Sequence, residues 1–364
     1  MFKKVVIVGV GLIGGSLGLS LIGRSLASTV VGVGRNPENL RLAVECGAIH
    51  KAADNLADAV AGADLVVLAA HVEAVGGLLK EMLPCLSEGT VVTDVSSTKV
   101  KIVRFASELM PPGVFFVGGH PMAGSEQQGV KGADPYLFEN AYYILTPLPE
   151  TPRFACDRVK DMAEGVGARV IEMTPEEHDR AVAAVSHLPH FAAVALVRSL
   201  ASLSDREKIL PLAAGGFRDS TRIAQSNTPM WRDIFISNKD MLLNMCRVFR
   251  QQLELLENAV VAEDGPRIIE LLEEAREVRR QVPAKTKGYL PVLYQILISV
   301  PDRPGVIGDL AVQLGKAGIN IADIEILRVR EGVGGSVRVA FATEAEQNSA
   351  VEELRRKGMQ VVKG

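Results

Sequence analysis

Val5-Val6-Ile7-Val8-Gly9-Val10-Gly11-Leu12-Ile13-Gly14 is the stretch that decides the fold of the first part of the chain. The apolar, β-branched run that ends at Val8 predicts a parallel strand buried on both faces. The glycines that follow suit a tight turn, close approach of the backbone to a pyrophosphate, and close contact between helix and strand. Residues Leu12–Leu26 then predict a helix whose N-terminus can bind phosphate. The residues expected to contact a dinucleotide are Gly9, Gly11, Leu12, Ile13 and Gly14.

Strand-like and helical segments continue to alternate after this turn. Further strands are expected at Val30–Val33, Leu65–Ala69, Thr90–Thr93 and Val114–Val117. Helices are expected between them, for example at Pro37–Cys46 and Val72–Leu83. This order is typical of an α/β domain with a doubly wound parallel sheet, so we expect a Rossmann-like domain over residues 1–173.

The end of the second strand bears on the choice of cofactor. An NAD site usually has Asp or Glu here to bind the ribose hydroxyls, and this chain has Gly34 followed by Arg35. Because Arg35 could pair with a 2′-phosphate, we expect use of NADP, or of both NAD and NADP. The alternative is that Arg35 is solvated or stacks on the adenine without selecting either.

Composition limits the class of protein. The 364 residues are enough for two or three domains, and 48% hydrophobic with 23% charged residues is typical of a globular protein. A net charge of −3 gives no global attraction to nucleic acid or to an anionic membrane. The four cysteines form no CxxC pair, so we expect buried free thiols in a reducing compartment. The apolar N-terminus superficially resembles a signal peptide, but its glycines suit a ligand-binding turn better, and we expect a cytoplasmic protein.

One histidine is the strongest candidate for catalysis. His120 lies in Gly118-Gly119-His120-Pro121-Met122-Ala123-Gly124, just beyond a predicted strand, where open α/β sheets bind their ligands. Imidazole has an unperturbed pKa of about 6.5 and can accept a proton near neutral pH. We predict that His120 is a general base; the alternative is a structural histidine in a glycine-rich turn.

The segment Asp94-Val95-Ser96-Ser97-Thr98-Lys99 ends the preceding strand and starts the next helix. One of its hydroxyls is expected to cap that helix, and another could reach the substrate or the nicotinamide. For Ser97, capping and a catalytic part are equally open.

Two further groups could bind a substrate. His187 and His190 are three residues apart and would share a helix face, but Pro189 interrupts the regular geometry and further ligands are lacking, so no metal is expected. Arg222 could bind a carboxylate through two parallel hydrogen bonds. An ordinary salt bridge from Arg222 to Asp219 or Asp233 is the alternative.

Taken together, these motifs resemble those of the prephenate dehydrogenase family, which oxidatively decarboxylates prephenate to 4-hydroxyphenylpyruvate. The resemblance runs from Lys3 to about Gln281 and is carried by GVGLIGGS, DVSSTK, GGHPMAGSE, SHLPH and FRDSTRIA followed by MWRDIF. It implies that His120 takes the proton of the ring hydroxyl and that Ser97 assists. It also implies that His190 and Arg222 bind substrate. Residues implied for the pocket wall or its gate are Glu126, Asp219 and Trp231.

Two positions depart from the family pattern. Gly34 and Arg35 replace the commoner Asp at the ribose position, and His71 stands where a proline usually follows the strand. The first departure puts NAD specificity in doubt, and we assign no role to His71. Arogenate dehydrogenase and a cyclohexadienyl dehydrogenase that accepts both substrates are alternatives. A β-hydroxyacid dehydrogenase would usually employ a lysine, and a non-catalytic sensor would need no base.

From Pro175 onward helical periodicity replaces the strand signals. Helices are expected at Asp179–Leu203, Asn238–Val261 and Pro266–Gln281, the last capped by Asp264. Helices this apolar often pair with a second subunit, so we expect an all-α substrate and dimerisation domain over residues 174–288 in a homodimer. The composition of residues 282–288 is typical of a linker.

Residues 289–364 predict a ferredoxin-like βαββαβ unit of the α+β class. They resemble the ACT domain, a regulatory module that commonly binds amino acids. We expect tyrosine to bind there and inhibit; the alternative is that this module only aids oligomerisation. The expected effector contacts are Asp302, Pro304, Gly305, Asn320 and Ile321.

Overall fold

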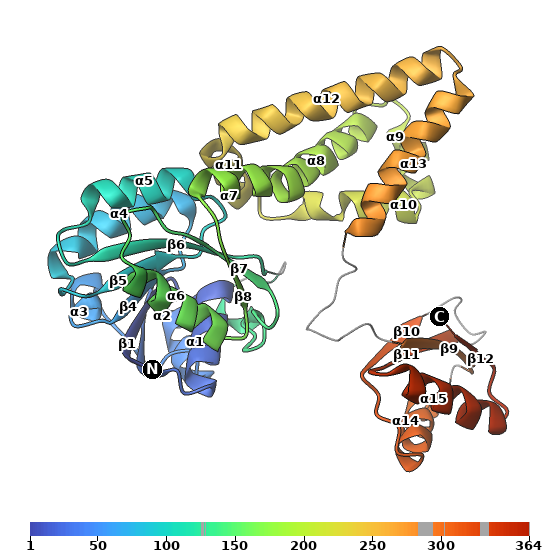
Figure 1. Ribbon diagram of the computed structural model, residues 1–364, viewed down its shortest axis with the longest axis horizontal. Helices are drawn as coiled ribbons and strands as arrows, with labels where there is room; N and C mark the ends of the chain where they lie inside the picture. The colour runs from blue at the N-terminus through green and yellow to red at the C-terminus, as the bar shows by residue number, and fades with distance from the viewer. Residues whose placement is uncertain (125–126, 128, 283–293, 302, 328–334, 364) are drawn as a thin grey trace. The chain divides into compact units, whose positions relative to one another are not determined.

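The computed structural model describes residues 1–124, 127, 129–282, 294–301, 303–327 and 335–363. The chain forms two compact units, Met1–Arg279 and Arg280–Gly364 (Figure 1). The first unit contains a large mixed sheet and a group of helices that follows it in sequence, and the second contains a small antiparallel sheet.

An eight-stranded sheet with the order β3-β2-β1-β4-β5-β6-β7-β8 is the centre of the first unit. All neighbouring strands are parallel except β6 and β7, which run antiparallel. The doubly wound α/β prediction is therefore confirmed. The strands are β1 Phe2–Val8, β2 Ala27–Val33, β3 Lys51–Ala52, β4 Leu65–Leu68, β5 Val91–Asp94, β6 Phe115–Pro121, β7 Tyr142–Thr146 and β8 Arg169–Glu172.

Helices cover both faces of this sheet (Figure 1). One face packs against α1 Leu12–Gly23, α2 Pro37–Glu45 and α6 Arg153–Gly165. The other packs against α3 Leu56–Val60, α4 Val72–Met82 and α5 Val100–Leu109. Because both faces are covered, the central strands are apolar throughout, and all four residues of β4 are buried.

Three expectations about this sheet need correction. Helix α1 ends at Gly23 and not at Leu26, because Ser25 takes a left-handed conformation (φ 55°) and turns the chain into β2. Strands β3, β7 and β8 were not predicted. Strand β6 continues through His120 to Pro121 because β7 pairs with its last four residues, so His120 lies within a strand and not beyond its end.

The cysteines are only partly as predicted. All four thiols are free, but only Cys156 is buried. Cys46 is exposed because it follows the last turn of α2, and Cys85 and Cys246 are half-buried.

The helical part of the first unit begins at Pro175, as predicted. Its helices are α7 Pro175–Val182, the π-helical turn η3 Ala183–His187, α8 Leu188–Ala201, α9 Arg206–Ile209, the 3₁₀ turn η4 Leu210–Leu212, α10 Gly215–Thr221, the 3₁₀ turn η5 Arg222–Gln225, α11 Thr228–Ser237, α12 Lys239–Val261 and α13 Gly265–Gln281. The π turn interrupts the single helix expected at 179–203 and ends two residues before Pro189, which has no N–H to donate to the preceding turn. The side chain of Asp264 accepts a hydrogen bond from the N–H of Arg267 at 3.0 Å, as expected for a cap.

The helical run Pro175–Ala201 is long and apolar enough to cross a membrane, judged by length and composition alone. It is the one such run among the described residues, and 28% of its most apolar window is buried. Large apolar side chains also remain exposed on α8, α12 and α13, including Phe191, Leu253 and Leu272. These helices therefore present apolar surface that a single copy of the chain leaves open.

The second unit has the predicted ferredoxin-like order. Its elements are β9 Tyr294–Val300, α14 Val306–Lys316, β10 Asp323–Leu327, β11 Gly335–Phe341, α15 Glu344–Arg356 and β12 Val361–Lys363. The sheet order is β10-β11-β9-β12, with antiparallel neighbours. Strand β10 begins at Asp323 and not at Asn320, because the chain leaves the left-handed Gly318 (φ 71°) through an extended connection. Apart from Val282, the expected linker lies outside the described residues.

Candidate active site

The glycines after β1 fit a dinucleotide. A Cβ on Gly9 would lie 2.3 Å from the carbonyl oxygen of Ala69, and a Cβ on Gly14 would lie 2.1 Å from that of Gly9. Gly11, by contrast, faces open space at the start of α1, and no side chain caps that helix. Only glycine fits the two crowded positions, and the uncovered N–H groups at the helix start are free to bind a pyrophosphate.

The ribose end of this site is open to solvent. Gly34 and Arg35 are both exposed just before α2. A Cβ on Gly34 would lie 3.5 Å from Cδ2 of Leu40, which is an ordinary contact. Crowding therefore does not explain why Gly34 lacks a side chain, and Arg35 is available to a ligand.

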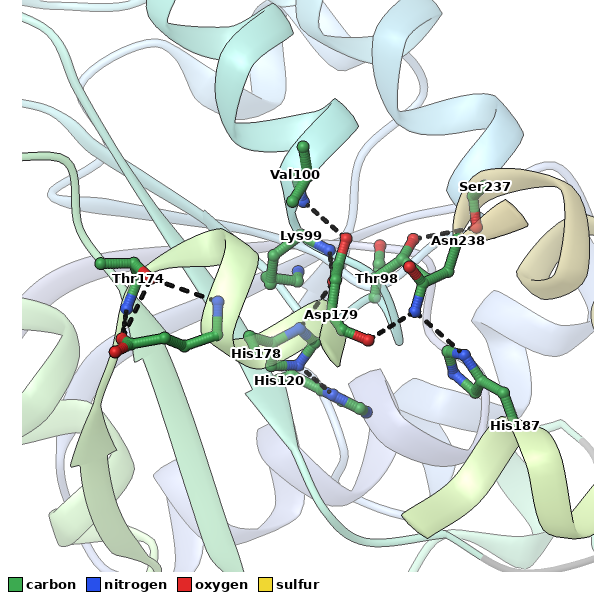
Figure 2. A network of polar contacts seen from close by, with 12 residues as sticks. Thr98, Lys99, Val100, His120, Thr174, His178, Asp179, His187, Ser237 and Asn238 are labelled. Carbon is green, nitrogen blue, oxygen red and sulfur yellow. Dashed lines mark hydrogen bonds and ion pairs between the residues drawn. The ribbon is translucent and has the colours of Figure 1, made fainter. Parts of the chain in front are cut away.

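His120 is the first member of a hydrogen-bonded relay (Figure 2). Its Nδ1 lies 2.8 Å from Nε2 of His178, and Nδ1 of His178 lies 2.8 Å from Oδ1 of Asp179. Because a carboxylate only accepts, Nδ1 of His178 carries the hydrogen, so Nε2 of a neutral His178 is an acceptor. Nδ1 of His120 then donates to it, and Nε2 of His120 is left with its lone pair. The relay thus prepares Nε2 of His120 to take a proton.

The electrostatics of the relay favour neutral rings. Burial, together with the neighbouring His178, Lys99 and His187, holds the pKa of His120 well below its ordinary value. Burial also lowers the pKa of His178, although its hydrogen bond to Asp179 acts in the opposite direction. A base must be neutral before it can accept a proton, so His120 is available at neutral pH.

Asp179 also connects the helical part to the nucleotide-binding part. Its carboxylate accepts hydrogen bonds from the N–H of Lys99 at 2.7 Å and from the N–H of Val100 at 3.0 Å. A negative charge at this place is favoured by the dipole of α5. The expected hydroxyl cap on this helix is therefore wrong, because a carboxylate from α7 takes that position. Ser97 is half-buried, and no hydrogen bond of its hydroxyl occurs within the described part of the chain.

The network continues from Asp179 to two other histidines. The side-chain amide of Asn238 donates to the carbonyl oxygen of Asp179 at 2.7 Å and lies 3.2 Å from Nδ1 of His187 (Figure 2). His187 meets Trp231 edge-on, and Trp231 stacks on His190 with 3.6 Å between ring centroids and 5° between planes. Burial lowers the pKa of His187 to about 4 and also lowers that of His190. Of the residues predicted for the site, His120, His190 and Trp231 are thus joined by one chain of contacts.

Two polar atoms of this stacked pair have no hydrogen-bond partner. Nδ1 of His190 and Nε1 of Trp231 are both buried and unsatisfied among the described residues. Such atoms are uncommon in native proteins and often mark a place where a ligand or water binds.

The other residues predicted for the site are less closely tied to it. Arg222 is exposed at the start of η5, which packs against α8, the helix of His190. Asp219 is exposed, and Asp233 pairs with Arg232 at 2.6 Å. Glu126 lies outside the described residues. Within the described ranges, no group of three or more His, Cys, Asp or Glu side chains could hold a metal ion.

The sequence interpretation missed His178, Asp179 and Asn238. The first two follow a capping box in which Thr174 and Glu177 start α7. A histidine next to an aspartate in the first turns of the helix that opens a new domain was the available signal.

In the second unit, Gly305 has φ 88° and precedes α14, as its predicted backbone role requires. A cavity of about 130 Å³ lies at this end of the helix. Its lining includes Arg303, Val306, Asp309 and Gln313, and Oε1 of Gln313 is buried without a partner among the described residues. Pro304, Gly305, Asn320 and Ile321 are not in its lining, and Asp302 lies outside the described residues.

Three family models match the chain in succession. Residues 17–172 match the nucleotide-binding domain of prephenate dehydrogenase, and residues 174–274 match its dimerization domain. Residues 294–357 match the ACT domain.

Relatives cover most of the chain. A prephenate dehydrogenase of Bacillus subtilis is 36% identical over 355 residues, which is 96% of this chain and 95% of the relative. A crystal structure of prephenate dehydrogenase from A. aeolicus, in complex with hydroxyphenyl propionate and NAD+, superposes with a TM-score of 0.74 at 36% identity, covering 78% of this chain and 99% of that one. The structure of Synechocystis arogenate dehydrogenase gives a TM-score of 0.70 at 32% identity, covering 77% and 100%.

Proposed function

The chain belongs to the prephenate dehydrogenase family of NAD(P)-dependent oxidoreductases, and we propose that its own substrate is prephenate. The product is 4-hydroxyphenylpyruvate, with loss of CO2. The observation that carries this proposal is the relay from Asp179 through His178 to His120, which leaves Nε2 of His120 ready to accept a proton. The domain boundaries that we infer are 1–173, 174–288 and 289–364.

His120 takes the proton of the hydroxyl on the substrate ring. As the O–H bond breaks, hydride leaves the same carbon, and a bound nicotinamide supplies the acceptor for it. The ring carboxylate then departs as CO2, its bonding electrons complete the aromatic ring, and the ring oxygen takes a proton back. His178 and Asp179 stabilise His120 while it carries the proton, because the positive charge is shared with an acceptor and a carboxylate.

Other residues hold the substrate for this step. Arg222 binds a substrate carboxylate, and Ser97 hydrogen-bonds the reacting hydroxyl. The unsatisfied nitrogens of His190 and Trp231 support a substrate contact at the stacked pair. We assign Asp219 and Glu126 to the pocket wall.

The cofactor turn is formed by Gly9, Gly11, Leu12, Ile13 and Gly14. Arg35 follows the exposed Gly34, and no carboxylate at position 34 binds a ribose 2′-hydroxyl. These residues support binding of a 2′-phosphate, so we propose use of NADP, or of both cofactors.

Turnover of prephenate and of arogenate, each with NAD and with NADP, tests these proposals together. We expect NAD(P)H formation with prephenate and comparable or better turnover with NADP. No turnover of either substrate would refute the proposed activity. The alternative activity is that of an arogenate or cyclohexadienyl dehydrogenase, which the similarity to the Synechocystis enzyme favours. Turnover of arogenate alone, or of both substrates, would establish it.

The apolar surface of α8, α12 and α13 supports a homodimer formed through residues 174–288. In such a dimer, the exposed Phe191, Leu253 and Leu272 are covered by the second copy. This also accounts for the apolar character of the run Pro175–Ala201 without a membrane, so we infer a cytoplasmic enzyme. Light scattering that gives the mass of one chain at micromolar concentration would contradict the dimer.

We propose that tyrosine binds the ACT domain and inhibits the enzyme. The left-handed Gly305 lets a ligand carboxylate approach the start of α14, and the nearby cavity holds both signs of charge in Arg303 and Asp309. The contacts are proposed at Asp302, Pro304, Gly305, Asn320 and Ile321. Deletion of residues 289–364 is expected to leave an active enzyme that ignores tyrosine, and an intact enzyme that ignores tyrosine would refute the proposal.

A further inference from the structure

The backbone that carries His120 is held by side chains on one edge. Parallel pairing between β5 and β6 runs as far as Thr93 and Val117 and stops there. Gly119, two residues later, still pairs with β7, but its other edge has no strand beside it. Its N–H donates to Oδ1 of Asp94 at 3.1 Å, and its carbonyl accepts a hydrogen bond from Nζ of Lys99 at 2.8 Å. Two side chains therefore replace the missing strand directly before His120.

These two side chains form a buried ion pair. Asp94 and Lys99 are both fully buried, and Nζ of Lys99 contacts Oδ2 of Asp94, which also accepts the N–H of Ser96 at 3.0 Å. A buried ion pair is retained only with complementary hydrogen bonds, because the desolvation of both charges is costly. Here those bonds go to the backbone of Gly119 and to the loop that carries Ser97.

The glycines before His120 leave room for this arrangement. A Cβ on Gly118 would lie 2.3 Å from Oγ1 of Thr146 and 3.3 Å from Cδ of Lys99. A Cβ on Gly119 would lie 2.7 Å from the carbonyl oxygen of Asp94. The GGH motif therefore allows the strand to approach the ion pair.

Lys99 also holds the other end of the relay. Its backbone N–H donates to Oδ1 of Asp179 at 2.7 Å, and the same oxygen accepts the Nδ1 hydrogen of His178. Through its side chain Lys99 fixes the strand of His120. Through its backbone it fixes the carboxylate that orients His178 (Figure 2).

We propose, on the basis of the proposed function, that Lys99 paired with Asp94 is a positioning residue that sets the separation between the His120 and His178 rings. Lys99 is fully buried, and its ammonium group contacts Asp94 and the carbonyl oxygen of Gly119. A displacement of about 1 Å at a reacting group can reduce turnover about 10²-fold, so we expect loss of the Lys99–Asp94 ion pair to lower kcat.

The charge of Lys99 gives this role a distinct signature. His120 is faced by His178 from α7, by His187 from η3 and by the ammonium of Lys99, and burial is the largest cause of its lowered pKa. The ammonium group lowers the pKa of both relay rings, and the carboxylate of Asp94 raises the pKa of His178. Loss of Lys99 therefore makes protonation of His120 easier, which a purely structural role in the fold would not do.

The test is the double variant Asp94→Asn/Lys99→Met, because Lys99→Met alone leaves a buried carboxylate without its partner. With prephenate we expect kcat to fall about 10²-fold, while KM and cofactor affinity stay unchanged. The acidic limb of the kcat–pH profile is expected to move to higher pH. Lys101→Met is the matched control: Lys101 is exposed in the first turn of α5, the helix that Lys99 precedes, and we expect wild-type values.

A second variant, Gly119→Ala, displaces the strand while both charges remain. We expect kcat to fall and the acidic limb to stay in place. Wild-type kcat and pH profile in the folded double variant, checked by circular dichroism and thermal unfolding, would overturn the inference. If the double variant does not fold, wild-type kcat in Gly119→Ala overturns it.

The ring nitrogen chemical shifts of His120 and His178 need no turnover. They are expected to change in the double variant and not in Lys101→Met, and identical shifts in all three proteins would count against the inference. A wild-type enzyme that turns over neither prephenate nor arogenate would instead refute the proposed function, and these chemical shifts would then decide the positioning role alone.

Discussion

Replacement of His178 by leucine tests the relay without touching the base itself. The change removes the acceptor that lies 2.8 Å from Nδ1 of His120 and one of the donors to Asp179. A hydrogen bond to a charged group contributes about 1.5–3 kcal/mol, and each 1.36 kcal/mol is about tenfold in rate. Because the charge on His120 exists only after proton transfer, the loss falls on the transition state. We therefore expect kcat with prephenate to fall about 10- to 100-fold, with little change in KM.

Steady-state rates of NAD(P)H formation measure this effect. His178→Gln keeps an oxygen acceptor and is expected to lose less than His178→Leu. His50→Leu is the matched control and should leave kcat unchanged. Nδ1 of His50 accepts the N–H of Val30 at 2.9 Å on β2, which three strands separate from β6. Wild-type kcat in folded His178→Leu would refute the relay.

Three further predictions concern pH, the cofactor and the substrate. The buried histidines of the site have folded-state pKa values below the unfolded value of about 6.5, so the folded state binds fewer protons and stability is lost as the pH falls below that value. For His187, with a pKa of about 4, the free energy of unfolding is expected to be about 3 kcal/mol lower at pH 4 than at neutral pH. Equal free energies of unfolding from denaturant titrations at pH 7.5 and 4.5 would contradict this prediction. Gly34→Asp should raise the NAD to NADP ratio of kcat/KM at least about tenfold, because a hydrogen bond to a charged group contributes about 1.5–3 kcal/mol, whereas Gly34→Ala should not. An unchanged ratio in Gly34→Asp would count against a ribose contact at this position. Arg222→Gln should weaken prephenate binding by about 2–3 kcal/mol, seen in KM, and an unchanged KM would remove Arg222 from the site.

Much of the fold could be predicted from the sequence because its signals are local. The strand, turn and helix around Gly9 and the change to helical periodicity at Pro175 depend on residues that are close in sequence. Strands β3, β7 and β8 were missed. Of these, β7 alters the position of His120, because it extends β6 by antiparallel pairing. The pairing of distant strands has no local signature.

The catalytic histidine of the site could be predicted from the sequence, but the hydrogen bonds that orient it could not. His120 stands in an unusual glycine-rich setting, which marks it in the sequence. His178 and Asp179 are ordinary helix residues, and their role depends on a contact with β6 that spans 58 residues. The cap on α5 was wrong for the same reason: the carboxylate of Asp179, 80 residues away, takes the position that a local hydroxyl was expected to occupy.

Proton transfer to His120 is tested most directly by His120→Asn, assayed with prephenate and the preferred cofactor. The asparagine amide can still donate to His178 as Nδ1 does, but it offers no basic nitrogen in the place of Nε2. We expect kcat to fall about 10²- to 10⁴-fold while substrate and cofactor binding change little. A folded His120→Asn enzyme with wild-type kcat would contradict it.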